Sequence, residues 1–146
     1  MGNPFVHVEL HADDVRAAKK FYKSVFDWKL EDMPGMDYTM IGVGKGAGGG
    51  MMKKPMPDEP AAWLPYVEVA DVKKTIEKAR EAGANVVLPY QSIGDMGAIG
   101  VFMDPAGAAI GVWELAKKAA APKKAAAKKA AKKTAKKAAK KKGSRR

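Results

Sequence analysis

Cysteine is absent from the 146-residue sequence. Disulfides, a thiolate nucleophile and zinc or iron–sulfur sites built on cysteine are therefore excluded. Long apolar runs are absent too, since none approaches the roughly 18–20 residues that span a bilayer as a helix. The first ten residues, MGNPFVHVEL, lack the basic segment followed by an apolar segment that is typical of a secretory signal. We therefore expect a cytoplasmic protein.

Acidic residues are absent from the last 30 positions, although the chain holds 16 of them. Residues 117–146 contain 13 Lys and 2 Arg, so this segment carries a formal charge of +15. The first 116 residues contain all 16 acidic residues and the other 12 basic ones, so they carry −4. The net charge of +11 therefore describes a mildly acidic body joined to a strongly basic tail.

The tail, residues 117–146, also lacks aromatic and branched aliphatic residues. It cannot bury a core, and its like charges repel along a helix, so we expect it to be disordered until a polyanion neutralises it. Its Lys/Ala composition is similar to the C-terminal tails of linker histones, which implies non-specific contact with nucleic acid and an association with the nucleoid. Lysine without aromatics favours duplex phosphates over base contacts. A tail that only solubilises the chain is the alternative.

The lysines of this tail that we predict to contact phosphate occur mostly in pairs separated by alanine. They are Lys123, Lys124, Lys128, Lys129, Lys132, Lys133, Lys136, Lys137, Lys140, Lys141 and Lys142.

Hydrophobic patterning divides the body into two related halves. Residues 5–11 alternate, with His7, Glu9 and His11 opposite three aliphatic residues, which predicts a half-buried strand. A helix from residue 15 to about 26 follows, and then strands at 28–31, 38–43 and 51–55. The same order recurs as a strand at 63–69, a helix at 72–82 and strands at 84–88, 98–103 and 108–115. The glycine-rich residues 44–50 are expected to be a flexible connection, because they lack the Gly-Lys-Ser/Thr ending of a phosphate loop.

This recurrence predicts an α+β fold of two tandem βαβββ modules, residues 4–55 and 61–115. Each module has a sheet with one face under its helix, and the two open faces are expected to curl as a mixed sheet around a shared cavity. Superposing Asp14 on Asp71 gives an offset of 57, which aligns Glu9 with Tyr66. The residues predicted to line the cavity are His7, Glu9, His11, Tyr66, Glu68 and Trp113.

Several segments of the body are similar to a known superfamily. The string VHVELHADDVRAAKKFYKSVFDW resembles the first strand and helix of vicinal oxygen chelate proteins, which include glyoxalase I, bleomycin-resistance proteins and extradiol dioxygenases. The segments GGGMMKKPMP, WLPYVEVADV and VFMDPAGAAIGVWE are similar to a bacterial glyoxalase-like subgroup. The resemblance covers residues 4–115 and implies the paired-module fold.

The resemblance also implies a divalent metal held by one residue from each of four strands. Carried onto this chain, the first position is His7, which matches. The other three fall near Gly50, Leu64 and Gly111, none of which has a coordinating side chain. We therefore expect no cofactor, although a divalent metal remains open. Glu9 with either His7 or His11 can supply two ligands, because residues i and i+2 of a strand lie roughly 7 Å apart on one face.

Glu9 and His11 are the candidate catalytic residues, as an acid–base pair that needs no metal. A polar, hydrogen-bonded lining is the alternative interpretation of the same residues. The function we expect is a glyoxalase-like protein that binds or converts an unidentified small molecule and contacts nucleic acid through its tail. The alternatives are a metal-dependent lactoylglutathione lyase or dioxygenase-type enzyme, and a nucleoid-associated protein whose body is a spacer or a homodimerisation unit. The patterning leaves open whether the modules pair within one chain or swap between two.

Overall fold

The computed structural model describes residues 2–117, so the predicted tail lies outside the described residues except for Lys117. The first half of the body contains β1 (Phe5–Ala12), α1 (Val15–Val25), β2 (Lys29–Asp32), β3 (Thr39–Gly42) and β4 (Gly48–Lys53). The second half contains β5 (Ala62–Glu68), α2 (Val72–Glu81), β6 (Asn85–Ser92), β7 (Ala98–Met103) and β8 (Ala109–Glu114). Neither of these two helices is long and apolar enough to cross a membrane.

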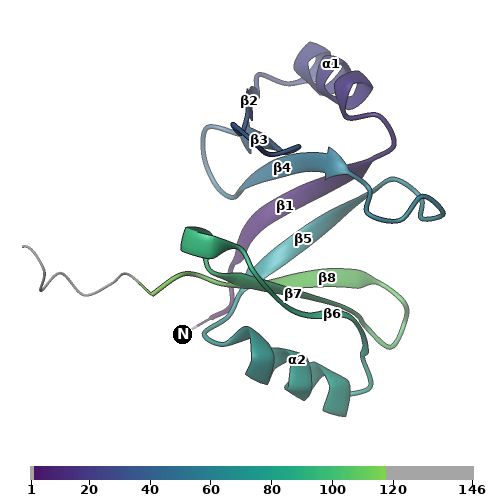
Figure 1. Cartoon of the computed structure of the whole chain (residues 1–146), viewed down its shortest axis with the longest axis vertical. Helices are drawn as coiled ribbons and strands as arrows, with labels where there is room; N and C mark the ends of the chain where they lie inside the picture. The colour runs from purple at the N-terminus through teal and green to yellow at the C-terminus, as the bar shows by residue number, and fades with distance from the viewer. Residues whose placement is uncertain (1, 118–146) are drawn as a thin grey trace, which may run out of the picture. The chain divides into compact units, whose positions relative to one another are not determined.

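The described strands form one curled, unclosed sheet in the order β2-β3-β4-β1-β5-β8-β7-β6 (Figure 1). Each half places its first strand parallel to its last, as β1 beside β4 and β5 beside β8. The two halves join where β1 runs antiparallel to β5. This confirms the predicted α+β fold, and it shows that the two halves pair within one chain.

Each helix begins at an aspartate. The Asp14 carboxylate accepts the N–H of Ala17, and the Asp71 carboxylate accepts the N–H of Lys74. Such caps satisfy backbone donors that have no partner inside the helix. They explain why the two Asp-Val pairs of the sequence mark equivalent points in the two halves.

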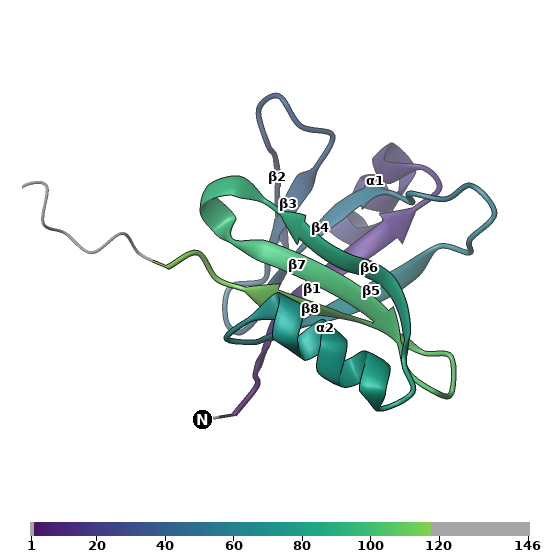
Figure 2. The ribbon, with the colours of Figure 1, turned by 60° about the horizontal axis from the view of Figure 1, so that its bottom comes forward.

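The two helices differ in how deeply they pack. Helix α2 buries Val72 and Ile76 and lies along β6, β7 and β8 (Figure 2). Helix α1 buries no residue completely, although Tyr22 packs against the core of Leu10, Ala12, Ile41 and Met51.

A cluster of aromatic rings connects α1 with the start of β5, and we call it the α1 aromatic face. Its members are Phe21, Tyr22, Phe26, Trp28 and Trp63, whose ring centroids lie 4.6–6.2 Å apart along the cluster. Phe21 is 58% exposed and Phe26 is 45% exposed. Tyr22 and Trp28 pack against the core, whereas Phe21 and Phe26 leave an exposed apolar edge beside them.

Two predicted segments were wrong. Residues 48–50 form the start of β4 instead of a flexible connection, because the strand lies between β1 and β3 and pairs with both. At Gly49 a side chain would overlap the backbone carbonyl of Val8, so glycine permits this close approach. Strand β6 continues past the predicted end at residue 88 to Ser92, and shifts in its register accommodate Pro89 on the edge of the sheet.

Candidate functional site

Three side chains from the middle of the sheet meet on the face opposite the α1 core. Register places His7 opposite Tyr66 and Glu9 opposite Leu64, so all four residues share one face of β1 and β5. His7, Glu9 and Tyr66 are buried, with 6%, 9% and 3% of their surface exposed. The alternation of β1 predicted this face for His7 and Glu9, and the 57-residue offset predicted Tyr66 beside them.

The Glu9 carboxylate is the centre of the cluster. One oxygen accepts a hydrogen bond from His11 Nε2 at 2.7 Å and lies 3.4 Å from the Tyr66 hydroxyl. The other oxygen accepts a hydrogen bond from the Tyr38 hydroxyl at 2.7 Å. Three donors from three different strands or loops therefore hold a single carboxylate, which is the arrangement that a buried anion requires.

His7 lies deeper than His11 and contacts the same network. Its Nε2 is 2.7 Å from the Tyr38 hydroxyl and 3.9 Å from Glu9 Oε2. Because the Tyr38 hydroxyl donates to Glu9, its oxygen accepts from His7, which assigns the proton of neutral His7 to Nε2. The Tyr66 and Trp113 rings stand edge-on to the imidazole, with centroids 5.9 and 5.1 Å away.

Burial and hydrogen bonding set the charge states of the cluster. Burial lowers the pKa of His7, although the neighbouring Glu9 charge opposes this effect. Burial by itself raises the pKa of Glu9, but hydrogen bonds from His11 and Tyr38 and the nearby histidines outweigh it and bring that pKa below its usual value. Burial and the Glu9 charge raise the pKa of both Tyr38 and Tyr66. At neutral pH Glu9 is thus an ionised carboxylate beside neutral His7 and the neutral hydroxyls of Tyr38 and Tyr66.

The residues at the implied metal positions do not fit a metal ion. Leu64 is apolar, and side chains at Gly50 and Gly111 would overlap the rings of Tyr38 and Tyr66. Glu114, the next carboxylate along β8, turns away and accepts the N–H of Val72 at the start of α2. Within residues 2–117 the structure has no group of three or more His, Asp or Glu side chains placed to hold a metal.

The other predicted site residues have different surroundings. Trp113 contacts His7, and its indole N–H also donates to the backbone carbonyl of Met96 at 2.8 Å. Glu68 is half-buried on the same face of β5, and its backbone carbonyl accepts a hydrogen bond from Asn3. The structure thus brings together His7, Glu9, His11, Tyr66 and Trp113, whereas Glu68 lies two residues farther along β5.

Tyr38 is the member of the cluster that sequence reasoning missed. It is the first residue of the strand predicted at 38–43, but the structure begins β3 one residue later, at Thr39, and the pattern did not indicate that its side chain reaches Glu9. The signal that could have found it is Gly50, because a glycine in a buried strand often marks a position that another group approaches closely.

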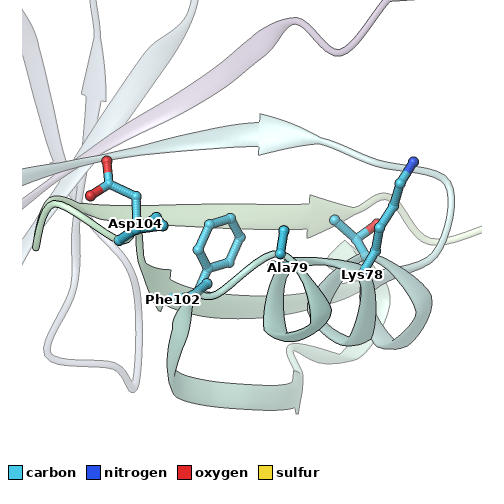
Figure 3. Close-up of a pocket in the computed structure, with 8 residues that line it drawn as sticks. Lys78, Ala79, Phe102 and Asp104 are labelled. Atoms are coloured by element: carbon cyan, nitrogen blue, oxygen red, sulfur yellow. The ribbon is translucent and has the colours of Figure 1, made fainter.

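Two pockets of the described residues lie away from this cluster. The larger, of about 330 Å³, is apolar and lies between α2 and the turn that follows β7, where Ala79 and Phe102 line it (Figure 3). The second, of about 260 Å³, is lined by Val8, Ile41 and the tryptophans of the α1 aromatic face. The rings of Tyr38, Tyr66 and Trp113 lie beside His7, on the face where the shared cavity is predicted.

Comparison with known proteins gives three kinds of similarity. The family described as bleomycin resistance protein-like N-terminal matches residues 4–44. A Mycobacterium tuberculosis protein named "Putative glyoxylase CFP32" is 36% identical over 116 residues, which are 73% of this chain and 44% of that protein. The protein of the same name in Mycobacterium bovis matches equally. This chain thus spans less than half the length of these relatives.

Solved structures show the same fold at low sequence identity. The methylmalonyl-CoA epimerase of Mycobacterium tuberculosis superposes with a TM-score of 0.61 at 18% identity, over 81% of this chain and 91% of that one. A glyoxalase/bleomycin resistance protein/dioxygenase superfamily member from Vibrio splendidus has a TM-score of 0.56 at 14% identity, over 77% and 99% of the two chains.

The body therefore has the fold of the vicinal oxygen chelate superfamily. Its sequence is similar to bleomycin-resistance-like proteins over the first module, and to the mycobacterial glyoxylase-named proteins over 73% of the chain. Together these findings support the superfamily that the resemblance of residues 6–28 indicated.

Acidification should destabilise the body through this cluster. A group whose pKa is lowered by folding stabilises the fold above its unfolded-state pKa, and that contribution is lost as the pH falls. The melting temperature should therefore begin to fall below pH 6.5, where unfolded His7 takes up a proton, and fall further below pH 4.5, where Glu9 does. Circular dichroism melts of the full chain measure both steps. His7→Gln should flatten the first step alone, and an unchanged pH profile in that variant would contradict the assignment.

Proposed function

We propose that the body binds a small molecule over the exposed side of the Glu9–His11 pair, as a ligand-binding protein or as an enzyme that works by proton transfer. The observation that carries this proposal is an ionised carboxylate, fully supplied with donors, bonded to a more accessible imidazole. The His11 side chain is 18% exposed, against 12% for Glu9 and 7% for His7. A ligand approaching this face would therefore meet His11 first.

Glu9 supports an acid–base role for His11. The His11 Nε2–H donates to Glu9, which leaves the lone pair of the neutral ring on Nδ1. A carboxylate bonded to the far nitrogen of an imidazole fixes its orientation and stabilises the imidazolium formed when the ring accepts a proton. His11 is then the proton-transferring group and Glu9 its partner, a type of catalysis that contributes about 10²–10⁴-fold to a rate.

The relatives support a small-molecule reaction of this kind. The mycobacterial proteins are named as glyoxylases, and solved structures with this fold include methylmalonyl-CoA epimerases. A metal-dependent lactoylglutathione lyase or dioxygenase-type enzyme has less support, because Gly50, Leu64 and Gly111 offer no ligand to a metal.

The two histidines of the chain provide a direct test of the ligand site. The full chain is mixed with methylglyoxal, glyoxylate, and methylglyoxal with glutathione, while NMR follows the two imidazole signals. We expect a binding compound to shift the His11 signal more than the His7 signal, and Glu9→Gln to weaken binding at least tenfold. Glu59→Gln, in an exposed loop, is the matched control and should bind as the wild type does. A compound that binds without moving the His11 signal would contradict this site.

We further propose that the tail, residues 117–146, holds the body on nucleic acid. The support is its formal charge of +15, which lies outside the described residues. The competing interpretation makes the nucleic-acid contact the whole function, with the body as a spacer or dimerisation unit. A chain without the tail distinguishes the two interpretations. It still binds a ligand if the body is a small-molecule protein, and it binds none if the body is only a spacer or dimerisation unit.

Deleting residues 117–146 changes the formal charge from +11 to −4 and should abolish binding to duplex DNA. If about 8–10 of the positive charges contact phosphates, log K should fall against log salt with a slope of roughly −7 to −9. Fluorescence anisotropy with an arbitrary duplex measures this slope. Replacing the tail lysines with arginine should retain binding, and replacing them with glutamine should abolish it. A slope near zero, or equal binding without the tail, would contradict a phosphate contact.

The α1 aromatic face supports a homodimer. An exposed apolar surface of this kind marks a contact with another protein. The 116 matched residues make up 44% of the mycobacterial relative, so its remainder is long enough for a second body of this size. We propose that a second copy of this chain packs against the α1 aromatic face, in the place of that second body.

Sedimentation of the full chain at high salt, which screens repulsion between the tails, tests the dimer. Phe21→Glu with Val25→Glu should convert a dimer to a monomer, because both side chains are more than half exposed on α1. Val87→Glu places one such charge on a similarly exposed residue of β6 and should leave the dimer intact. A wild type that stays monomeric over the whole dilution series would overturn the proposal.

A further inference from the structure

Two glycines of the sheet occupy positions where the fold leads one to expect side chains. Gly50 lies in β4 and Gly111 in β8, both are buried, and both have ordinary negative φ. Glycine in a strand interior costs about 0.5–1 kcal/mol relative to alanine. Because the backbone does not require glycine at either position, another contact must explain each one.

A tyrosine ring covers each glycine. A Cβ atom at Gly50 would overlap the hydroxyl and ring of Tyr38, and a Cβ atom at Gly111 would overlap the ring of Tyr66. Tyr66 and Gly111 are direct partners in the pairing of β5 with β8. A phenol ring therefore fills the space that a side chain at each glycine would occupy.

Both rings direct their hydroxyls at the same group. The Tyr38 hydroxyl lies 2.7 Å from one oxygen of Glu9, and the Tyr66 hydroxyl lies 3.4 Å from the other. Tyr38 comes from the first half of the body and Tyr66 from the second. Glu9 is thus held from both halves of the sheet, as a metal with ligands from both modules would be.

We infer that the Glu9 carboxylate occupies the place that the metal would have in this fold. The Tyr38 and Tyr66 rings fill the space that two of the metal ligands would need. Divalent metals are excluded because the two tyrosine rings occupy the site, and also because ligand side chains are missing. A metal could enter only if both rings moved, which would leave an ionised, buried carboxylate without its two tyrosine donors. This inference concerns the architecture of the site and holds whichever small molecule the body binds.

A double-mutant cycle in the full chain tests the two ring–glycine pairs. Gly50→Ala and Gly111→Ala should each lower the melting temperature by about 4–12 °C, the effect of overpacking a body of this size. In the Tyr38→Ala and Tyr66→Ala backgrounds, respectively, the same alanines should have no effect or raise the melting temperature. Gly42→Ala is the matched control, because a Cβ there meets only ordinary contacts, 3.5 Å or more from Lys29. Full tolerance of Gly50→Ala with Tyr38 in place would overturn the inference.

Metal binding provides the second measurement. The wild type titrated with Ni²⁺ or Zn²⁺ should show no stoichiometric binding and no melting shift on addition of a chelator. A variant with Gly50→Glu, Leu64→His and Gly111→Glu should bind Ni²⁺ only when Tyr38→Ala and Tyr66→Ala are also present. If that variant does not fold, the double-mutant cycle decides alone. One tightly bound equivalent of metal in the wild type would contradict the inference.

Discussion

The ionised Glu9 carboxylate is the constraint on which the centre of this structure depends. It is buried at the junction of β1 with β5, where the two halves of the sheet meet. A buried charge without partners destabilises a fold strongly, so its donors must stay in place. Tyr38 and His11 supply them from the first half, and Tyr66 supplies the longer contact from the second. One carboxylate thus fixes the positions of three side chains and the glycines beneath two of them.

The same constraint separates this body from the four-ligand metal site that the superfamily resemblance implies. The positions that would hold ligands are two glycines and a leucine, and aromatic rings take up the space above the glycines. Under the proposed function, chemistry on this face comes from O–H and N–H groups. His11 is the most accessible of these groups, so the proposed function depends on it.

Periodicity predicted much of the fold and part of the site. Alternation in β1 placed His7 and Glu9 on one face, and the repeat placed Tyr66 beside them, because strand side chains alternate strictly. The two aspartate caps and the recurring element order predicted the paired halves. The start of β4 at Gly48 was missed, since glycine has low strand propensity and only tertiary pairing makes that segment a strand.

Other features of the site depend on contacts that no local pattern encodes. Tyr38 begins the strand predicted at 38–43, but its place over Gly50 follows from the pairing of β3 with β4, which the pattern of one strand does not specify. The packing of the rings beside His7 was not predictable for the same reason, because these rings come from three distant segments. The α1 aromatic face was not predicted either, because an amphipathic pattern does not indicate which apolar residues a neighbouring element covers.

A crystal structure of the full chain grown with excess Ni²⁺ tests the central claim most directly. The account predicts the Tyr38 and Tyr66 rings over Gly50 and Gly111, their hydroxyls on Glu9, and no ion among these side chains. An ion coordinated by His7, with either ring swung away from its glycine, would contradict it.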